Sequence, residues 1–345
     1  MKKKVALITG ISGQDGAYLA NFLLKKNYKV IGTDRRSSRS NLWRLRRLGI
    51  EKKIIFEEME LSENCEIDRM FKKYRNLNEV YNLAAQSFVA TSFNSPINTS
   101  NITGIGTLRI LESIRNFNPK IKFYQASSSE MYGKILEKNQ NETTPFNPTS
   151  PYAISKVFAH FITKNYREAY NMFAVSGILF NHESPLRGEE FVTRKITLGL
   201  TKIFNNDLDC LELGNINAKR DWGYAKEYVE LMWAMLQRKK AEDFVIATGK
   251  YYSIKDFIEE CLKILKIKAR WVGKGLGTKL VRLKDKKTII RINPRFFRPS
   301  DVNLLHGDAS KAKKKLNWKP KTNLKKLVKI MMEDEIKYYN KKIIY

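Results

Sequence analysis

The chain has 345 residues, 43% of them hydrophobic, so it is long enough for two domains with buried cores. Lys and Arg number 64 against 35 Asp and Glu, a formal net charge of +29. This excess is spread along the chain and accompanies no RNA-recognition or zinc-finger pattern. We interpret it as a solvated surface that attracts anions, and we expect no nucleic-acid partner.

Other residue types exclude further classes of protein. Cys65, Cys210 and Cys261 lie far apart, which favours reduced thiols over a disulfide framework. The three histidines lack metal-ligand spacing, so we predict no metal site. The apolar run behind Met1 is too short for a signal peptide, and no stretch approaches the ~20 apolar residues of a membrane span. We therefore expect a cytoplasmic location and no membrane partner.

The first half of the chain alternates short apolar runs with helical periodicity. Strands are predicted at 5–9, 29–33, 54–56, 80–83, 121–126 and 174–180, and helices at 17–26, 99–115 and 152–170. This alternation predicts an α/β fold with a doubly wound parallel (Rossmann) sheet. Later segments are shorter and mixed, and they close with helices at 308–316 and 323–339.

Three glycines, Gly10, Gly13 and Gly16, follow the first predicted strand and open the first helix. Glycine permits a tight turn and a close approach of the backbone to phosphate. The N-terminus of the helix presents free N–H groups and a positive dipole end to a pyrophosphate. In this context the pattern predicts a dinucleotide site.

Residues at the end of the second strand bear on which dinucleotide binds. Asp34 alone favours NAD, because a carboxylate binds the ribose hydroxyls. Arg35 and Arg36, followed by two serines, favour the additional phosphate of NADP. We predict NADP. Residues 1–180 are then the NADP-binding domain and residues 181–345 a smaller α/β substrate domain, packed on the first and interleaved with it.

Tyr152 and Lys156 are four residues apart on a predicted helix, so the ammonium lies beside the phenol. A cation at about 4 Å supplies about 4 kcal/mol at an effective dielectric of 20, which would bring the tyrosine pKa from about 10 towards neutrality. Such a tyrosine can accept a proton from an alcohol while hydride leaves the same carbon. A tyrosine and a lysine at this spacing occur often by chance. Here the pair follows a dinucleotide-type glycine turn in the sequence, and this context favours a catalytic role.

Several longer strings, including I-T-G-I-S-G-Q-D-G, F-N-H-E-S-P-L-R-G-E-E-F and R-D-W-G-Y-A-K-E-Y, resemble the GDP-mannose 4,6-dehydratases, which are extended short-chain dehydrogenases/reductases. The resemblance implies oxidation of a GDP-sugar at C4, elimination of water across C5 and C6, and hydride return to C6. It also implies a homodimer or homotetramer.

The resemblance implies roles for individual residues. Tyr152 is the base at the C4 hydroxyl, Lys156 assists it, Ser128 binds the C4 oxygen and Glu130 removes the C5 proton. Cofactor contacts are expected from Gly10, Ser12, Gly13, Gln14, Asp15, Gly16, Arg35, Arg36, Glu60, Leu61, Ala84, Ala85, Gln86, Ser87, Tyr152, Lys156, His182 and Arg187. Substrate contacts are expected from Ser87, Glu130, Asn181, Lys195, Arg220, Arg298 and Asp301.

Some positions depart from the family pattern, namely Ser128, Leu186, Asn98, Asp301 and a short basic segment at 273–292. These departures leave the reaction unchanged but leave open whether the sugar is GDP-mannose or a GDP-manno-heptose. A 4-epimerase, 4-oxidase or reductase on the same fold is one alternative, and a non-catalytic basic binding protein is another. Glu130 argues for the dehydratase, although its spacing alone fits a solvated loop acid equally well.

Overall fold

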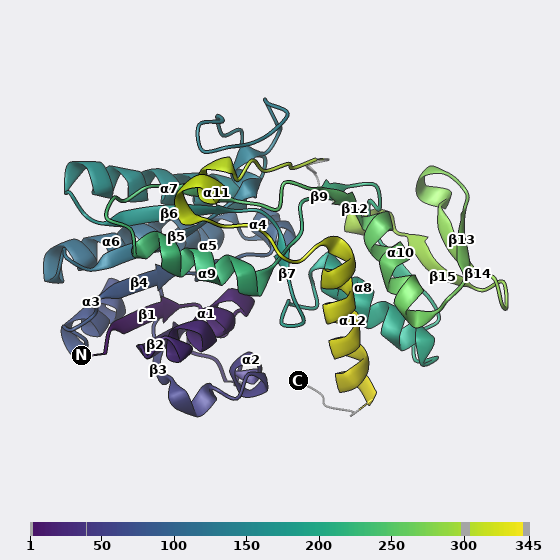
Figure 1. Cartoon of the computed structure of the whole chain (residues 1–345), viewed down its shortest axis with the longest axis horizontal. Helices are drawn as coiled ribbons and strands as arrows, with labels where there is room; N and C mark the ends of the chain where they lie inside the picture. The colour runs from purple at the N-terminus through teal and green to yellow at the C-terminus, as the bar shows by residue number, and fades with distance from the viewer. Residues whose placement is uncertain (1–2, 39, 298–303, 341–345) are drawn as a thin grey trace.

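The computed structural model describes residues 3–38, 40–297 and 304–340 of the chain. In this part, seven parallel strands form one sheet in the order β11-β6-β5-β4-β1-β2-β3 (Figure 1). The strands are β1 (Val5–Thr9), β2 (Lys29–Asp34), β3 (Ile55–Glu58), β4 (Glu79–Asn82), β5 (Lys122–Ser128), β6 (Ala174–Leu179) and β11 (Phe244–Ile246). The predicted doubly wound Rossmann sheet is confirmed.

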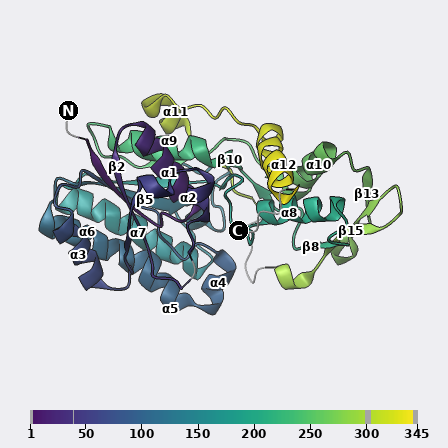
Figure 2. The same ribbon diagram turned by 90° about the horizontal axis from the view of Figure 1, so that it is seen from below.

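Helices cover both faces of this sheet (Figure 2). One face carries α1 (Gln14–Lys25), α9 (Ala225–Leu236) and α11 (Ser310–Leu316), and their core includes residues of β1 and β6. The other carries α3 (Asn64–Lys73), α6 (Gly106–Phe117) and α7 (Pro151–Ala169). Strands enclosed on both faces consist of almost continuous apolar residues, and every residue of β1 is buried.

The predicted helix at 99–115 is not one regular helix. It consists of α5 (Pro96–Thr99), a π-helical stretch at Ser100–Ile105 and α6. Gly104 and Gly106 lie at its junction, where an added Cβ would approach Phe158 to 3.3 Å and Leu61 to 3.0 Å. A wide turn with close neighbours is not visible in hydrophobic periodicity, which explains the difference.

A second sheet is built from residues after position 200. It has the order β13-β14-β15-β8, with β8 (Leu211–Leu213), β13 (Ala269–Val272), β14 (Lys279–Arg282) and β15 (Thr288–Ile292). Its core is shared with α8 (Val192–Phe204), α10 (Ile254–Leu265) and α12 (Leu324–Asn340). α10 begins in a capping box, in which Ser253 and Asp256 satisfy each other's backbone N–H groups.

Segments after residue 180 contribute to both sheets. β11 is a strand of the larger sheet, and α9 and α11 pack in the core against that sheet. The division of the chain at residue 180 stays a prediction. Two short pairings, β7 (His182–Glu183) with β10 (Gly223–Tyr224) and β9 (Lys219–Arg220) with β12 (Tyr252–Ser253), lie in the connecting region. No helix in the described ranges has the length and apolar character needed to cross a bilayer.

Candidate active site

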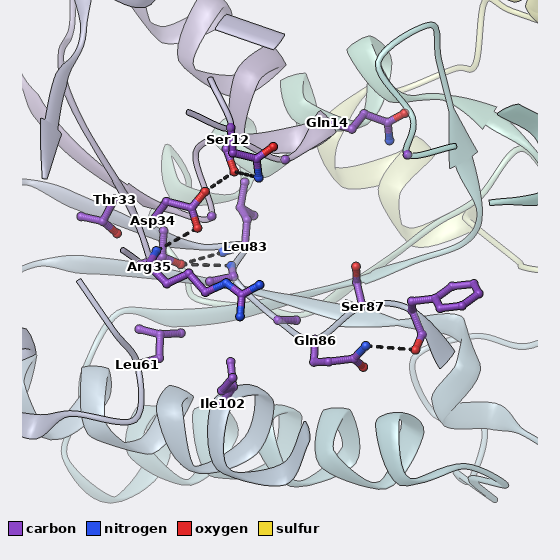
Figure 3. Close-up of a pocket in the computed structure, with 18 of the residues that line it drawn as sticks. Ser12, Gln14, Thr33, Asp34, Arg35, Leu61, Leu83, Gln86, Ser87 and Ile102 are labelled. Atoms are coloured by element: carbon purple, nitrogen blue, oxygen red, sulfur yellow. Dashed lines mark hydrogen bonds between the residues drawn. The ribbon is translucent and has the colours of Figure 1, made fainter. Parts of the chain in front are cut away.

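A cavity of about 450 Å³ lies where the order of the large sheet reverses between β1 and β4. Ligands of open α/β sheets bind at this place, outside the carboxyl ends of the strands. The cavity brings together many of the predicted cofactor contacts: Gly10, Ser12, Gly13, Gln14, Arg35, Glu60, Leu61, Ala84, Ala85, Gln86, Ser87 and Arg187 (Figure 3). Arg36 is exposed and lies outside this lining.

The glycine turn has the geometry that its residue types predict. Gly10 has φ +68°, and a Cβ there would lie 2.9 Å from the Cα of Ala84. A Cβ on Gly16 would lie 2.4 Å from the carbonyl oxygen of Gly10. The turn closes when the N–H of Gly13 donates to that same carbonyl at 3.0 Å. α1 begins at Gln14, so its free N–H groups face the cavity.

Asp15 and His182 form a buried pair behind the turn. His182 Nε2 lies 2.7 Å from Asp15 Oδ2, and the other ring nitrogen lies 2.8 Å from the Phe180 carbonyl oxygen. Burial lowers the pKa of His182, but Asp15 outweighs burial and leaves this pKa raised. Burial raises the pKa of Asp15, but the neighbouring His182 outweighs burial and leaves this pKa lowered. Neither residue lines the cavity, so in this structure the pair positions the turn.

At the end of β2, Asp34 and Arg35 point in different directions (Figure 3). The Ser12 hydroxyl donates to Asp34, which also accepts the backbone N–H of Arg35 at 2.9 Å. The Arg35 side chain extends into the cavity. Both residues line the cavity. Asp34 is engaged by the Ser12 hydroxyl and the Arg35 N–H, whereas Arg35 presents its cation to the cavity.

Arg44 is a lining residue that the sequence analysis missed. It lies on α2 (Trp43–Arg47), donates to the Ser12 carbonyl oxygen at 2.9 Å and to the Leu186 carbonyl oxygen at 2.6 Å. Burial lowers its pKa to about 10, although Glu190 acts in the opposite direction. It lies ten positions beyond the end of β2, so no sequence motif connected it with the turn. The dense run of arginines in 35–47 was the available signal.

Tyr152 and Lys156 lie on the buried side of the first turns of α7. The Ser150 hydroxyl caps this helix by accepting the N–H of Ala153 at 3.1 Å, and Pro151 occupies the first helical position. Tyr152 is 8% exposed and Lys156 3%. The ammonium of Lys156 donates to the Ala126 carbonyl oxygen at 2.7 Å and lies 5.8 Å from the Tyr152 ring centroid.

The expectation that Lys156 alone brings the Tyr152 pKa towards neutrality is wrong for this structure. Burial raises the pKa of Tyr152 to about 12, against the lowering effect of its hydrogen bond with Ser128 and of Arg187. Burial also lowers the pKa of Lys156 to about 8. The spacing argument treated both groups as if they were solvated, and burial disfavours the charged form of each.

Ser128 and Glu130 are placed beside Tyr152 by the end of β5. Ser128 is the last residue of the strand, and its hydroxyl accepts the N–H of Glu130 at 3.2 Å. Glu130 belongs to the 3₁₀ turn Ser129–Tyr132, and its charge raises the pKa of Tyr152. The end of β5 thus places the Ser128 hydroxyl at the Tyr152 phenol, with the Glu130 carboxyl near enough for its charge to act on that phenol.

The predicted substrate contacts are less closely grouped. The Asn181 Oδ1 is buried and accepts no hydrogen bond from the described residues. Lys195 is half-buried on α8, with its ammonium 3.4 Å from the Phe296 ring centroid, and burial lowers its pKa. Arg220 is buried on β9 and donates to the Lys219 carbonyl oxygen at 2.9 Å. Arg298 and Asp301 lie outside the described residues.

Two departures from the family pattern have clear surroundings. Leu186 is 2% exposed and packs in the core under α1, and its carbonyl oxygen accepts from Arg44. Arg44 and Arg187 therefore provide cations near the turn although position 186 has none. Asn98 is exposed and lines the cavity.

Comparisons with known proteins agree with the geometry. Residues 7–331 match the family model of GDP-mannose 4,6 dehydratase. The chain is 49% identical to GDP-mannose 4,6 dehydratase of Drosophila melanogaster over 99% of its length and 88% of the relative. It is 46% identical to the Homo sapiens enzyme of that name, over 97% of the chain and 92% of the relative.

Solved structures show the same fold at lower identity. UDP-glucose 4-epimerase of Thermotoga maritima superposes with a TM-score of 0.80 at 24% identity, over 98% of this chain and 99% of that one. dTDP-glucose 4,6-dehydratase of Bacillus anthracis, in complex with NAD, gives 0.78 at 21%, over 98% and 97%. These likenesses are evidence of the extended short-chain dehydrogenase/reductase fold alone, so the epimerase alternative gains no support from them. By the family model and the close relatives, the chain belongs to the GDP-mannose 4,6-dehydratase family.

Proposed function

We propose that the protein is a hydro-lyase that converts GDP-mannose to its 4-keto-6-deoxy derivative. The observation that carries this proposal is the grouping of three side chains at the end of β5: Ser128 hydrogen-bonds Tyr152, and Glu130 is near enough for its charge to raise the Tyr152 pKa. A 4-epimerase or a simple reductase needs no carboxylate that takes a proton from C5. In a chain of this family, Glu130 is the residue that a dehydration requires.

We propose NADP as the cofactor. The glycine turn gives a phosphate close access to backbone N–H groups, because a Cβ at Gly10 or Gly16 would collide with neighbouring backbone. Arg35 supports the additional phosphate, because its cation lines the cavity, and Asp34, which also lines it, is engaged by Ser12. The Gln86 Oε1 is also buried and accepts no hydrogen bond within the described ranges, as expected of a group that awaits a ligand.

A nicotinamide held by the glycine turn would supply the hydride chemistry, namely removal of hydride from C4 and its return to C6. The chain's own residues move the protons. Tyr152 accepts the proton of the C4 hydroxyl, and Ser128 donates a hydrogen bond to the same oxygen. Once C4 is a ketone, the C5 proton is acidic enough for an ordinary carboxylate, so Glu130 can remove it and deliver a proton to the departing C6 hydroxyl, which leaves as water. C5 then takes a proton from solvent as hydride reaches C6. A positive charge near Tyr152 would counter the effect of burial on its pKa.

The test separates oxidation from elimination. We expect Glu130→Gln to retain some cofactor reduction by GDP-mannose but to release little 4-keto-6-deoxy product, with turnover lower by about 10²- to 10⁴-fold. Glu259→Gln on the exposed face of α10 is the matched control and should leave turnover unchanged. The parent enzyme working in heavy water should place deuterium at C5. Unlabelled product, or normal turnover by Glu130→Gln, would remove Glu130 from the mechanism.

The size of the sugar and the assembly belong to the same proposal. We propose that both GDP-mannose and a GDP-manno-heptose are turned over, because Ser128 leaves more space than a threonine would. A methyl-sized change supplies about 1–3 kcal/mol of discrimination. We also propose a homodimer or homotetramer, supported by the exposed apolar side chains of Ile97 on α5 and of Ile154 and Phe158 on α7. Light scattering of the holoenzyme would detect a monomer if this is wrong.

A further inference from the structure

A second depression of about 980 Å³ lies outside the active site and shares no lining residue with its cavity. It is bounded by the second half of α7, the loop at 142–146, the segment at 239–243 before β11, and Lys311 at the start of α11. Figure 1 shows the loop that precedes α7 above α7 and α11. β11 is the edge strand of the large sheet, so the depression lies beside that edge.

One wall of the depression is aromatic. Phe146, His160 and Phe161 contact one another edge to face, with ring centroids 5.2 to 5.8 Å apart. Phe161 is 52% exposed and borders the apolar face of Ile154 and Phe158 that we propose as the subunit contact. The depression lies on the other side of its ring, where His160, Lys164 and Arg167 also line it, and that side is the one offered to a ligand. Aromatic rings arranged in this way suit a planar partner, which can pack edge to face or offset against them.

His160 provides a polar group in the same wall. It is 6% exposed, and its Nδ1 lies 3.2 Å from the Ser127 hydroxyl. Its Nε2 forms no hydrogen bond with any described residue. Burial lowers the pKa of His160 and so favours the neutral ring, in which Nε2 donates or accepts according to the tautomer. The proposed reaction makes no use of this imidazole.

The charges around the depression favour an anion. Each acidic residue of the lining has a protein partner: Glu142 accepts the N–H of Val245, Asp243 pairs with Arg167, Glu242 with Lys315, and Glu168 with Lys164. Lys239 and Lys240 are exposed and form no ion pair with the described residues. Two cations at the rim are thus available to a ligand, whereas the acids are engaged.

We propose that this depression is a second ligand site, for a planar ring that bears a phosphate or carboxylate. The ring packs on Phe161 and reaches His160 Nε2, and the anionic group lies against Lys239 and Lys240. Ser127, the partner of His160, directly precedes Ser128 on β5. A ligand on His160 is therefore linked, through the hydrogen bond of His160 with Ser127, to the strand that carries a proposed catalytic hydroxyl. This site does not depend on the proposed function.

The experiment uses the three histidines of the chain as reporters in NMR spectra of the holoenzyme. Each ring signal is assigned by its loss in His160→Gln, His182→Gln or His306→Gln. Titration with phenyl phosphate should shift the His160 signal and saturate. The His182 signal reports separately on ligand that enters the cofactor site, because His182 contacts Asp15 behind the glycine turn. Inorganic phosphate and benzyl alcohol should each shift His160 at least tenfold less at equal concentration.

Variants locate the binding. Phe161→Ser and the double variant Lys239→Ser, Lys240→Ser should each weaken phenyl phosphate binding about tenfold. Phe204→Ser is the matched control, because Phe204 on α8 is 51% exposed and lies outside the depression. Adenosine monophosphate and 4-hydroxybenzoate then distinguish a nucleotide from an aromatic acid as the natural ligand. The proposal would be overturned if phenyl phosphate left the His160 signal unshifted at up to ten times the concentration of the phosphate control. Equal affinity of phenyl phosphate for all variants would overturn it too.

Discussion

The two sides of the active site are built differently. On the cofactor side, most of the polar groups described bond to one another, as Ser12 does to Asp34 and Asp15 to His182, although Gln86 Oε1 accepts no hydrogen bond from the described residues. Gly10 and Gly16 in the glycine turn leave no room for a Cβ. On the substrate side, Lys195 lies over Phe296 and Asn181 Oδ1 has no partner among the described residues. A side that binds a cofactor throughout the cycle can be fixed in advance. A side that receives and releases substrate keeps its polar groups available.

The largest expected effect is at the point where the two sides meet. Tyr152→Phe removes the proton acceptor and leaves the ring in place, so turnover should fall by about 10²- to 10⁴-fold. NADP should remain bound at parent affinity, measured by calorimetry. Tyr166→Phe, further along α7, is the matched control. Weak NADP binding in Tyr152→Phe would mean that the Tyr152 hydroxyl is needed to hold the cofactor, so that the loss of turnover could not be assigned to the missing proton acceptor.

The stability of the cofactor side should depend on the Asp15–His182 pair. Replacing one partner of a buried pair costs about 3–5 kcal/mol, so His182→Gln should unfold at markedly lower denaturant concentration. The raised pKa of His182 makes its contribution complete below pH 6.5 and lost as pH rises through the folded pKa. The lowered pKa of Asp15 makes its contribution complete above pH 3.8 and lost as pH falls through its folded pKa.

The difference in unfolding free energy between the parent and His182→Gln should thus be greatest from about pH 4 to 6.5 and should narrow on either side. Chemical denaturation at a series of pH values measures it. A difference that is constant with pH would show that the two side chains are not coupled.

The sequence predicted local features of the active site better than features that depend on the whole fold. The glycine turn and the Tyr152–Lys156 spacing depend on local backbone geometry, so each could be predicted from one short segment of the sequence. Arg44 was missed because a separate short helix brings it to the turn. The Tyr152 pKa was predicted wrongly because burial is a property of the whole fold. The second sheet was not foreseen strand by strand, because its pairings join residues as distant as Leu211 and Ile290.

Cofactor choice sharpens the comparison, because the two arginines after β2 are not equivalent. Arg35 lines the cavity and Arg36 does not, which makes Arg36→Ala a matched control. Arg35→Ala should weaken NADP by about 1.5–3 kcal/mol, or about tenfold to a hundredfold, and leave NAD affinity nearly unchanged. Fluorescence titration with both cofactors measures the four affinities. Equal losses of NADP and NAD would show that Arg35 does not bind the additional phosphate.

The smallest effect is expected on the substrate side, at Lys195. Its ammonium is half-buried over Phe296, so Lys195→Gln removes a cation that is only partly desolvated, and an exposed charge contributes about 1 kcal/mol or less. We therefore expect KM for GDP-mannose to rise about fivefold, with little change in kcat, because a diphosphate contact is the same in the ground state and the transition state. Lys202→Gln, near the end of the same helix, should change neither constant. A fall in NADP affinity in Lys195→Gln would contradict the division, because it would place a cofactor contact on the side that we assign to substrate.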